Sequence, residues 1–350
     1  MEFNRRLFLA GLAATITPFA RAFEILGPRD LPLLAIKRAP LSLDKNIQRI
    51  LFGSCNRQNR TQDFWPVIDG FNPDLFISLG DNIYGDTVNP TVLESKYKTL
   101  KNDSYYRQFA EKNPMIGIWD DHDFGQNNAG SGNPIRFESQ QLFCDFFNES
   151  ENSERRTRSG IYTSYELEGG RIKIIMLDTR FNRDDCSRCG PEDDLLGSEQ
   201  WDWLENELSY NQAEVTIFCS GITVVSNPMN ATEDWVDYPY SHQRLMELLE
   251  ATKPQGCIFL TGDKHFGGIF PRTPRELSFP VLEVMSSGLT HSAPLVSRPI
   301  IRAVFNTAEI FLGRNFGELS FQLNQKQPTV TAMIRNITGQ VERQLTWPIV

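Results

Sequence analysis

The 350-residue sequence predicts an α/β protein in which buried strands alternate with helices. Short apolar runs recur along the chain, and each is apolar throughout rather than on alternate residues. Such runs are typical of strands that are covered on both faces. Helical patterns lie between several of the runs, which favours an α/β architecture. The expected strands are residues 48–53, 74–79, 115–119, 171–178, 214–220, 257–261 and 280–285.

The helical patterns predict helices over residues 92–112, 198–209 and 241–251. The first follows a proline, and the other two begin at Ser198 and Ser241, which are suitable N-cap residues. Apolar residues recur on one face of the last two helices, at Trp201, Leu204, Leu208, Leu245, Leu248 and Leu249.

Three further strands are expected near the C-terminus, and they form a meander over Glu318–Asn324, Thr329–Asn336 and Glu342–Trp347. The segment Asn336-Ile337-Thr338-Gly339 supplies turn residues between the last two. Residues 124–160 are rich in Asn, Gly, Ser and Arg, and we expect a partly mobile surface loop there.

The N-terminus has the features of an export signal. Asn4-Arg5-Arg6-Leu7-Phe8-Leu9 resembles the twin-arginine pattern, an apolar stretch follows to Ala20, and Ala20-Arg21-Ala22 fits a cleavage site. A membrane anchor and an amphipathic helix of the mature chain are the alternatives, but the stretch is too short to span a bilayer comfortably. We expect residues 1–22 to direct the protein to the periplasm or out of the cell through the export machinery. Residues 23–47 are then a lead-in segment, and residues 48–350 form one domain.

The charge balance argues against one class of partner. With 35 Lys and Arg residues against 44 Asp and Glu residues, the net charge is −9. Nonspecific nucleic-acid binding needs a basic surface, so no nucleic-acid partner is expected. An acidic protein can still bind a phosphate ester if bound cations invert the local field.

The six cysteines divide by context. Cys186 and Cys189 lie in a polar loop, where we expect a disulfide or two free thiols. Half of a zinc site is the less favoured alternative, because no second Cys-x-x-Cys completes four ligands. Cys144, Cys219 and Cys257 lie in apolar contexts and are expected to be buried.

Residues capable of binding metals follow four of the expected strands. They are Cys55 after the first strand, Asp81 and Tyr84 after the second, Asp120, Asp121, His122 and Asp123 after the third, and Asp263 and His265 after the strand at 257–261. Ligands of open α/β sheets collect beyond the carboxyl ends of the strands, so these groups could converge on one point. Each residue alone has an ordinary structural explanation; their coincidence at successive strand ends predicts a two-metal site.

The residue types also indicate which metals the site would hold. A carboxylate such as Asp81 can bridge two cations. The thiol of Cys55 and the phenol of Tyr84 are not anions at neutral pH, but a strongly Lewis-acidic ion such as Fe3+ would deprotonate both. Oxygen ligands such as Asp121 favour a harder second ion, with Ca2+, Mg2+ and Mn2+ all compatible.

These residues together resemble the PhoD-like alkaline phosphatases, a branch of the calcineurin-type metallophosphoesterases. The resemblance runs from about Leu51 to Leu289. It implies a four-layer α/β/β/α sandwich and hydrolysis of phosphate monoesters or diesters. It also implies a ferric ion held by Cys55, Asp81, Tyr84 and Asp263, and a second ion, calcium, held by Asp81, Asp121 and His265. The motifs that carry it are Gly53-Ser54-Cys55, Gly80-Asp81-Asn82-Ile83-Tyr84, Trp119-Asp120-Asp121-His122-Asp123, Leu177-Asp178-Thr179-Arg180 and Gly262-Asp263-Lys264-His265.

The sequence departs from the family pattern in three places. Residues 23–47 leave no room for the immunoglobulin-like domain of the best-known members. Asn82 stands where those members have tyrosine, and it is expected to contact substrate. Thr223 stands where related chains often place an amide, so no ligand is expected from that strand.

Three residues have expected roles outside the ligand set. His122 would protonate the leaving alkoxide or steady the phosphoryl oxygens. Arg180 offers a bidentate fork for phosphate, with an ion pair to the acidic loop 184–194 as the alternative. His291 is an outside candidate for the rim of the site. The remaining alternatives are a phospholipase- or nuclease-type phosphodiesterase and a non-catalytic metal-binding module.

Overall fold

The computed structural model describes residue 36 and residues 38–186, 189–226 and 233–349. The expected export signal at 1–22 lies outside these residues, as do residues 23–35 and 37 of the lead-in segment. No helix in the described part of the chain combines the length and the apolar character needed to cross a membrane.

The first of two mixed sheets has six strands in the order β13-β12-β11-β1-β2-β3. Strands β1, β2 and β3 run parallel, with β3 at one edge, and the C-terminal meander adds to β1 antiparallel through β11. The bounds are β1 Arg49–Gly53, β2 Leu75–Leu79, β3 Met115–Ile118, β11 Asn315–Gln322, β12 Thr329–Asn336 and β13 Val341–Pro348.

The second sheet has seven strands in the order β10-β8-β9-β7-β6-β5-β4. Strands β9, β7, β6 and β5 are parallel, and β4, β8 and β10 pair antiparallel at the two edges. The bounds are β4 Thr163–Leu167, β5 Ile172–Met176, β6 Val215–Ser220, β7 Ile258–Thr261, β8 Gly267–Arg272, β9 Val281–Ser286 and β10 Ile310–Phe311.

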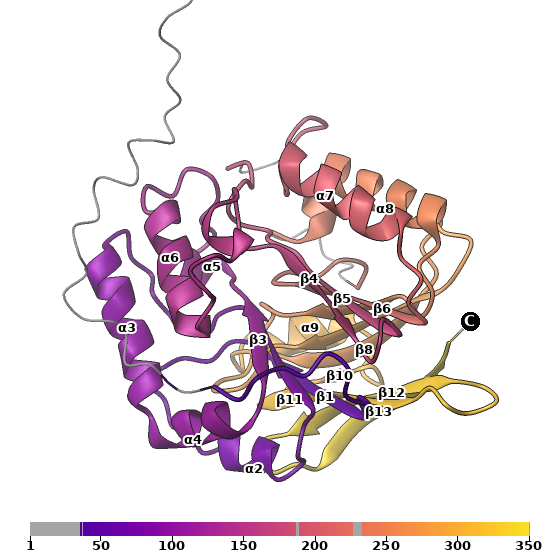
Figure 1. Cartoon of the computed structure of the whole chain (residues 1–350), viewed down its shortest axis with the longest axis horizontal. Helices are drawn as coiled ribbons and strands as arrows, with labels where there is room; N and C mark the ends of the chain where they lie inside the picture. Colours follow the sequence, from indigo (N-terminus) through magenta and orange to yellow (C-terminus); the bar gives the residue numbers. More distant parts are fainter. Residues whose placement is uncertain (1–35, 37, 187–188, 227–232, 350) are drawn as a thin grey trace, which may run out of the picture. The chain divides into compact units, whose positions relative to one another are not determined.

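Helices cover the outer faces of both sheets (Figure 1). On the six-stranded sheet lie α2 (Trp65–Asp69), α3 (Pro90–Asn102), α4 (Ser104–Lys112) and α6 (Arg136–Phe147). Trp65 of α2 packs against Phe76 of β2 and Phe109 of α4, with ring centroids 5.1 and 4.8 Å apart. Burial of such large apolar rings is the main source of stability for this layer.

On the seven-stranded sheet lie α7 (Ser198–Ser209) and α8 (Pro239–Thr252). Trp201 and Leu245 of these helices share a buried cluster with Phe218 and Phe259 of the sheet. The short α9 (Arg298–Val304) packs its Ile301 against a second cluster that contains Phe270. The remaining short helices are α5 (Asp121–Phe124) and the 3-10 turns Glu154–Arg156 and Trp235–Asp237.

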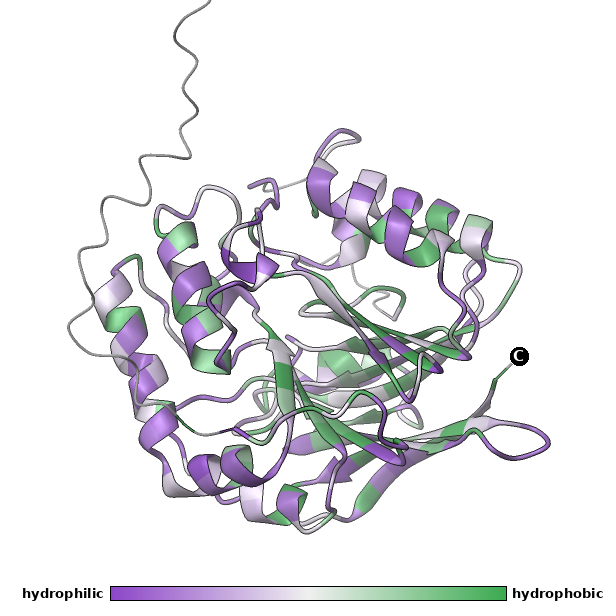
Figure 2. Cartoon of the chain, viewed as in Figure 1, coloured by the Kyte–Doolittle hydropathy of each residue, from purple (hydrophilic) through white to green (hydrophobic). Residues whose placement is uncertain are grey.

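The inner faces of the two sheets meet, because β8 and β9 contact β11 and β12. The result is the four-layer α/β/β/α sandwich that the sequence and its resemblance predict. Figure 2 shows the consequence for side chains: the strands are largely hydrophobic, and hydrophilic residues are frequent on the helices. In this arrangement the carboxyl ends of the parallel strands of both sheets reach the same edge.

One predicted helix and one predicted loop need correction. The expected helix at 92–112 is two helices, because Asp103 takes an extended conformation and its carboxylate caps the amides of Tyr105 and Tyr106. Residues 124–160 are not a surface loop, since α6 lies within them and buries Phe143 and Phe146. The polar composition concealed an amphipathic helix in this segment.

The expected N-caps are also wrong in detail. Ser198 is the first residue of α7 rather than its cap, which is Gly197. Helix α8 begins two residues before Ser241, whose hydroxyl instead donates to Asp194 and accepts from the amide of Leu195. A serine near a helix start can therefore serve a neighbouring loop.

Candidate metal centre

Four of the six residues expected to bind metals have an unusual backbone conformation in the loops that follow their strands. Cys55, Asp81, Asp263 and His265 have φ values of 60°, 50°, 68° and 58°. Residues other than glycine rarely occupy this left-handed region, and such strained positions concentrate at functional sites.

Two glycines allow the strand ends to come this close. A Cβ on Gly262, after β7, would lie 2.7 Å from the Ser54 hydroxyl and 2.8 Å from the Leu79 carbonyl. A Cβ on Gly80, at φ 94°, would lie 2.6 Å from Cβ of Asp120. The ends of β1 and β2 in one sheet thus contact the end of β7 in the other, and the end of β3 lies against that of β2.

The first group of converging side chains contains Cys55, Asp81 and His265, whose ligand atoms all lie within 4.8 Å of one another. The Cys55 thiol donates to Asp81 Oδ2 at 3.4 Å. The Tyr84 phenol also donates to Asp81 Oδ2, at 3.1 Å, and lies 3.1 Å from His265 Nε2. The four side chains form one set of sulfur, oxygen and nitrogen donors.

His291 joins this group more closely than the sequence indicated. Its Nε2 lies 3.1 Å from the Tyr84 phenol and 3.1 Å from His265 Nε2, while Nδ1 lies 3.0 Å from the Thr290 hydroxyl. The expectation of a rim position therefore understates its place. His291 follows β9, whose end carries Ser286, Ser287 and Gly288. None of these three residues indicated a metal site.

The second group contains Asp81, Asp121 and His122, again with one ligand atom from each within 4.8 Å of the others. The imidazole of His122 stacks on the Tyr84 ring at 4.1 Å between centroids. Its Nδ1 lies 2.6 Å from Asp86 Oδ1. Asp81 is common to both groups and so occupies the position of a bridging residue.

The electrostatics of the centre call for cations. Burial, reinforced by Cys55 and Asp121, raises the pKa of Asp81 well above its ordinary value. Burial raises the pKa of Cys55 to about 12 and also raises that of Tyr84, on which the Asp81 charge acts in the same direction. Asp81 Oδ1 is buried without a hydrogen-bond partner. A bound cation would reverse each of these penalties, so this donor set fits a metal centre.

Asp263 and His265, both after β7, have different surroundings. The Asp263 carboxylate pairs with Lys264 Nζ at 2.7 Å, and Lys264 also reaches Asp234 at 3.0 Å. Burial opposes ionisation of Asp263, but the charge and hydrogen bond of Lys264, together with the charges of Arg180 and His265, lower its pKa. The resemblance implies that His265 shares an ion with Asp121; in the structure His265 belongs to the group of Cys55 and Asp81, and the charge of Asp121 also acts on it.

Arg180 is fully buried and already paired. Its Nε donates to Asp120 at 2.7 Å and its Nη1 to Glu233 at 2.5 Å, while Nη2 lies 3.9 Å from Asp121. Neither of the two close partners belongs to the acidic loop 184–194, so the alternative pairing expected from the sequence is wrong. The guanidinium supports the carboxylates behind the centre.

The side chain of Asn82 also forms hydrogen bonds within the fold. Its amide donates to the Ile118 carbonyl at 2.9 Å and to Asp123, and its oxygen accepts from Ser78. The side chain is 4% exposed. The expected substrate contact does not match this geometry, because every polar atom of Asn82 joins β2 to the loop after β3.

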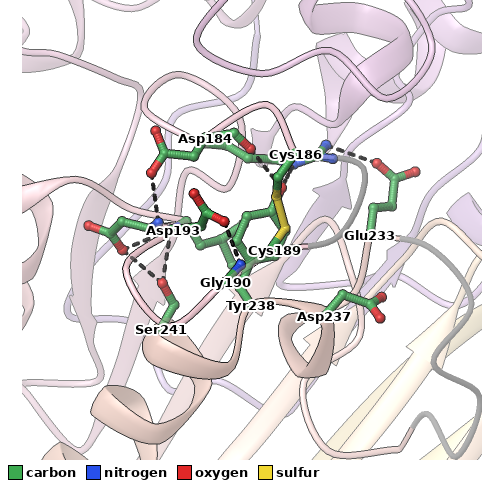
Figure 3. The surroundings of a disulfide bond; sticks show 12 residues. Asp184, Cys186, Cys189, Gly190, Asp193, Glu233, Asp237, Tyr238 and Ser241 are labelled. Carbon is green, nitrogen blue, oxygen red and sulfur yellow. Dashed lines mark hydrogen bonds and ion pairs between the residues drawn. A yellow bond between two sulfur atoms is a disulfide. The ribbon is translucent and has the colours of Figure 1, made fainter.

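The loop that follows Arg180 is closed by a disulfide between Cys186 and Cys189 (Figure 3). The loop is held against α8, since Tyr238 donates to the Asp184 carbonyl at 2.9 Å. The disulfide is one of the two states that the sequence favoured over zinc. Cys144, Cys219 and Cys257 are buried and free, as expected.

Three contributors to the centre were missed from the sequence. Glu233 is buried and binds both Arg180 and Arg183. Asp86 holds His122, and the Ser287 hydroxyl accepts a hydrogen bond from the His265 amide. Asp86 lies only two residues beyond Tyr84 and could have been found there, whereas Glu233 follows no strand and gave no signal.

Comparison with known proteins agrees with this arrangement. Residues 52–299 match the family described as PhoD-like phosphatase. Alkaline phosphatase D of Bacillus subtilis (strain 168) is 21% identical in an alignment of 229 residues that covers 56% of this chain and 39% of that protein. The chain therefore spans well under two thirds of the length of this curated relative.

Solved structures share the fold at low identity. A structure of PhoD has a TM-score of 0.64 and 17% identity, covering 87% of this chain and 73% of that one. A dimetal phosphatase from Danio rerio has a TM-score of 0.52 and 12% identity, covering 87% of this chain and all of the other (100%). Because the family match extends over more than half of the sequence, this chain belongs to the PhoD-like phosphatase family.

Proposed function

We propose that the protein is an exported, metal-dependent phosphoesterase that hydrolyses phosphate monoesters, phosphate diesters or both. The observation that carries the proposal is the position of Asp81. This buried carboxylate belongs to both groups of donors and keeps one oxygen without a hydrogen-bond partner. The family to which the chain belongs supports the same reaction class, and the relatives that it resembles are named as phosphatases.

The donor types suggest which ion each group would hold. Cys55, Asp81, Tyr84 and Asp263 would hold Fe3+, with His265 and His291 close to the same set. Asp81 and Asp121 would hold Ca2+, or alternatively Mg2+ or Mn2+, beside His122. When bound, such ions neutralise phosphate oxygens and lower the pKa of water, which supplies a nucleophile.

The chain's own residues would position the ester and move protons. His122 is half-buried, and Asp86 holds its Nδ1, so Nε2 is the nitrogen left to exchange a proton with the leaving oxygen. Asp86 would keep the imidazole in the orientation that this transfer needs. Arg180 would act indirectly, by holding Asp120 behind the centre.

The site of action follows from the export signal expected at residues 1–22. An enzyme carried by the twin-arginine route would work in the periplasm or outside the cell, where a small phosphate ester is its substrate. The net charge of −9 disfavours a nucleic-acid polymer. The Cys186–Cys189 disulfide is compatible with an oxidising compartment.

Hydrolysis of a chromogenic phosphate monoester and its matching diester tests the proposal. The metal-loaded protein should turn over at least one of them and lose activity to a chelator. Asp81→Ala should abolish turnover while the fold survives, and Asp69→Asn on the remote α2 should not change it. Full activity of Asp81→Ala, or no turnover of either ester by the metal-loaded protein, would contradict the proposal.

A further inference from the structure

Most cations around the centre are neutralised by carboxylates. Arg180 pairs with Asp120 and Glu233, and its side chain is 0% exposed. Lys264 pairs with Asp263 and Asp234. These two side chains stabilise buried negative charge. Arg180 keeps its Nη2 without a hydrogen-bond partner, but its side chain is fully buried and a substrate cannot reach it.

Arg57 differs from these cations. Its guanidinium carbon lies 4.5 Å from the centroid of the Tyr84 ring, at the group that contains Cys55 and Asp81. Among the residues that the structure describes, no carboxylate pairs with it, and its buried Nε has no hydrogen-bond partner. The residue is half-buried, so solvent and small ligands can reach it. An unpaired arginine with an orphaned donor is an open anion site.

The positive charge of Arg57 lies beside the metal-binding side chains. The Tyr84 ring beside its guanidinium carries the hydroxyl that contacts Asp81, His265 and His291. A phosphoryl group held at this centre would come within its reach.

The backbone of Arg57 is fixed to the same loops. Its amide donates to the Thr290 hydroxyl at 2.8 Å, and that hydroxyl lies 2.9 Å from the Cys55 carbonyl. The preceding residue, Asn56, donates its amide to the Asp81 carbonyl at 2.8 Å. These hydrogen bonds fix the backbone at Arg57 to the loops after β1, β2 and β9. A fixed backbone reduces the conformational entropy that is lost when the side chain binds a ligand.

We propose that Arg57, and not Arg180, is the arginine that binds the phosphoryl group of the substrate. This inference rests on the phosphoesterase function proposed above and assigns its anion contact. The planar guanidinium would donate to phosphoryl oxygens from its two Nη groups, a geometry that lysine cannot reproduce. Its cation would offset the negative charge that the surrounding carboxylates present to an incoming phosphate.

Calorimetric titration of the metal-loaded protein with inorganic phosphate tests the assignment without turnover. Arg57→Gln should weaken phosphate binding by about tenfold or more, as expected for loss of a charge-assisted hydrogen bond. Arg57→Lys should recover part of the loss. The control is Arg60→Gln, which removes the same charge from an exposed residue three positions away and should change the affinity less than about twofold.

The same variants separate a binding role from a structural one. Arg57→Gln should raise KM more than it lowers kcat and should keep the metal content of the wild type. Loss of metal from this variant would mean that Arg57 only supports Tyr84, and it would overturn the inference. So would unchanged phosphate affinity in Arg57→Gln, or absence of phosphate binding by the wild type. The wild type could bind phosphate through Arg57 and yet hydrolyse neither ester. That result would contradict the proposed function and leave the role of Arg57 in place.

Discussion

Asp81 accepts a hydrogen bond from the Tyr84 phenol at 3.1 Å through Oδ2, while its other oxygen is buried without a partner. A buried carboxylate with one free oxygen is costly in a protein that binds no cation there. The φ of 50° at Asp81 adds backbone strain at the same residue. Such a position destabilises the fold, which is the usual compromise at a functional site.

Asp81→Asn should therefore separate stability from function. Asparagine tolerates the left-handed backbone. It also removes a carboxyl group whose ionisation is opposed by burial and by the charge of Asp121. We expect the metal-free variant to unfold at a higher temperature than the metal-free wild type, while hydrolysis is lost. Thermal unfolding with and without added metal checks this. A variant that gains as much stability from metal as the wild type does would argue against Asp81 as a ligand.

Tyr84→Phe should remove the colour of the iron-loaded protein. Phenylalanine keeps the ring that stacks on His122 but lacks the hydroxyl that contacts Asp81 and His265. A ferric ion bound to a phenolate gives a visible charge-transfer band, so the wild type should show one and the variant should not. Visible spectra at matched iron content provide the measurement. A band that persists in Tyr84→Phe would exclude this phenol as the ligand.

His122→Gln should lower kcat by about 10² to 10⁴-fold with little change in KM, as expected for loss of a general acid. Asp86→Asn should lower kcat less, by about tenfold, because the imidazole loses only the partner of its Nδ1. Glu94→Gln, a half-buried change on α3, is the control and should have no effect. Equal activity of Asp86→Asn and the wild type would mean that Asp86 does not position His122.

Lys101 gives a prediction that is independent of the metals. Its ammonium is buried and donates to the Asp145 carbonyl at 2.9 Å; burial, helped by the charge of Arg38, lowers its pKa to about 7. Between that value and its ordinary pKa of about 10.4, the unfolded chain binds more protons than the folded protein. Stability should therefore rise with pH across this window, by at most about 1.4 kcal/mol per pH unit.

Lys101→Met should abolish this rise. The free energy of unfolding, measured with urea from pH 7 to pH 10, should climb less steeply in the variant than in the wild type. Lys98→Met, on the same helix but more exposed, should keep the wild-type slope. Parallel profiles for Lys101→Met and the wild type would show that Lys101 is charged in the folded protein throughout.

The strands and the convergence of their ends could be predicted because short stretches of sequence indicate both. An apolar run followed by a ligand-type residue, as at β2 and Asp81, carries its own signal. The split between α3 and α4 was missed because Asp103 acts through its capping hydrogen bonds rather than through composition. Helix α6 was missed because its buried face is broken by polar residues.

The distribution of residues between the two groups could not be predicted. Which side of Asp81 a residue such as His265 faces depends on how the two sheets meet, and this involves strands far apart in the chain. The exposure of an arginine is equally nonlocal. Arg180 is neutralised by Glu233, 53 residues away, whereas Arg57 remains unpaired in the part of the chain that the structure describes.

The central claim is that Asp81 bridges two metal ions that are needed for phosphoester hydrolysis. Elemental analysis of the purified wild type and Asp81→Asn, run beside hydrolysis of a phosphate monoester and a diester, tests it most directly. We predict one iron and one divalent ion per wild-type chain, loss of metal in Asp81→Asn, and turnover by the wild type only. Full metal content and undiminished turnover in Asp81→Asn would contradict the claim.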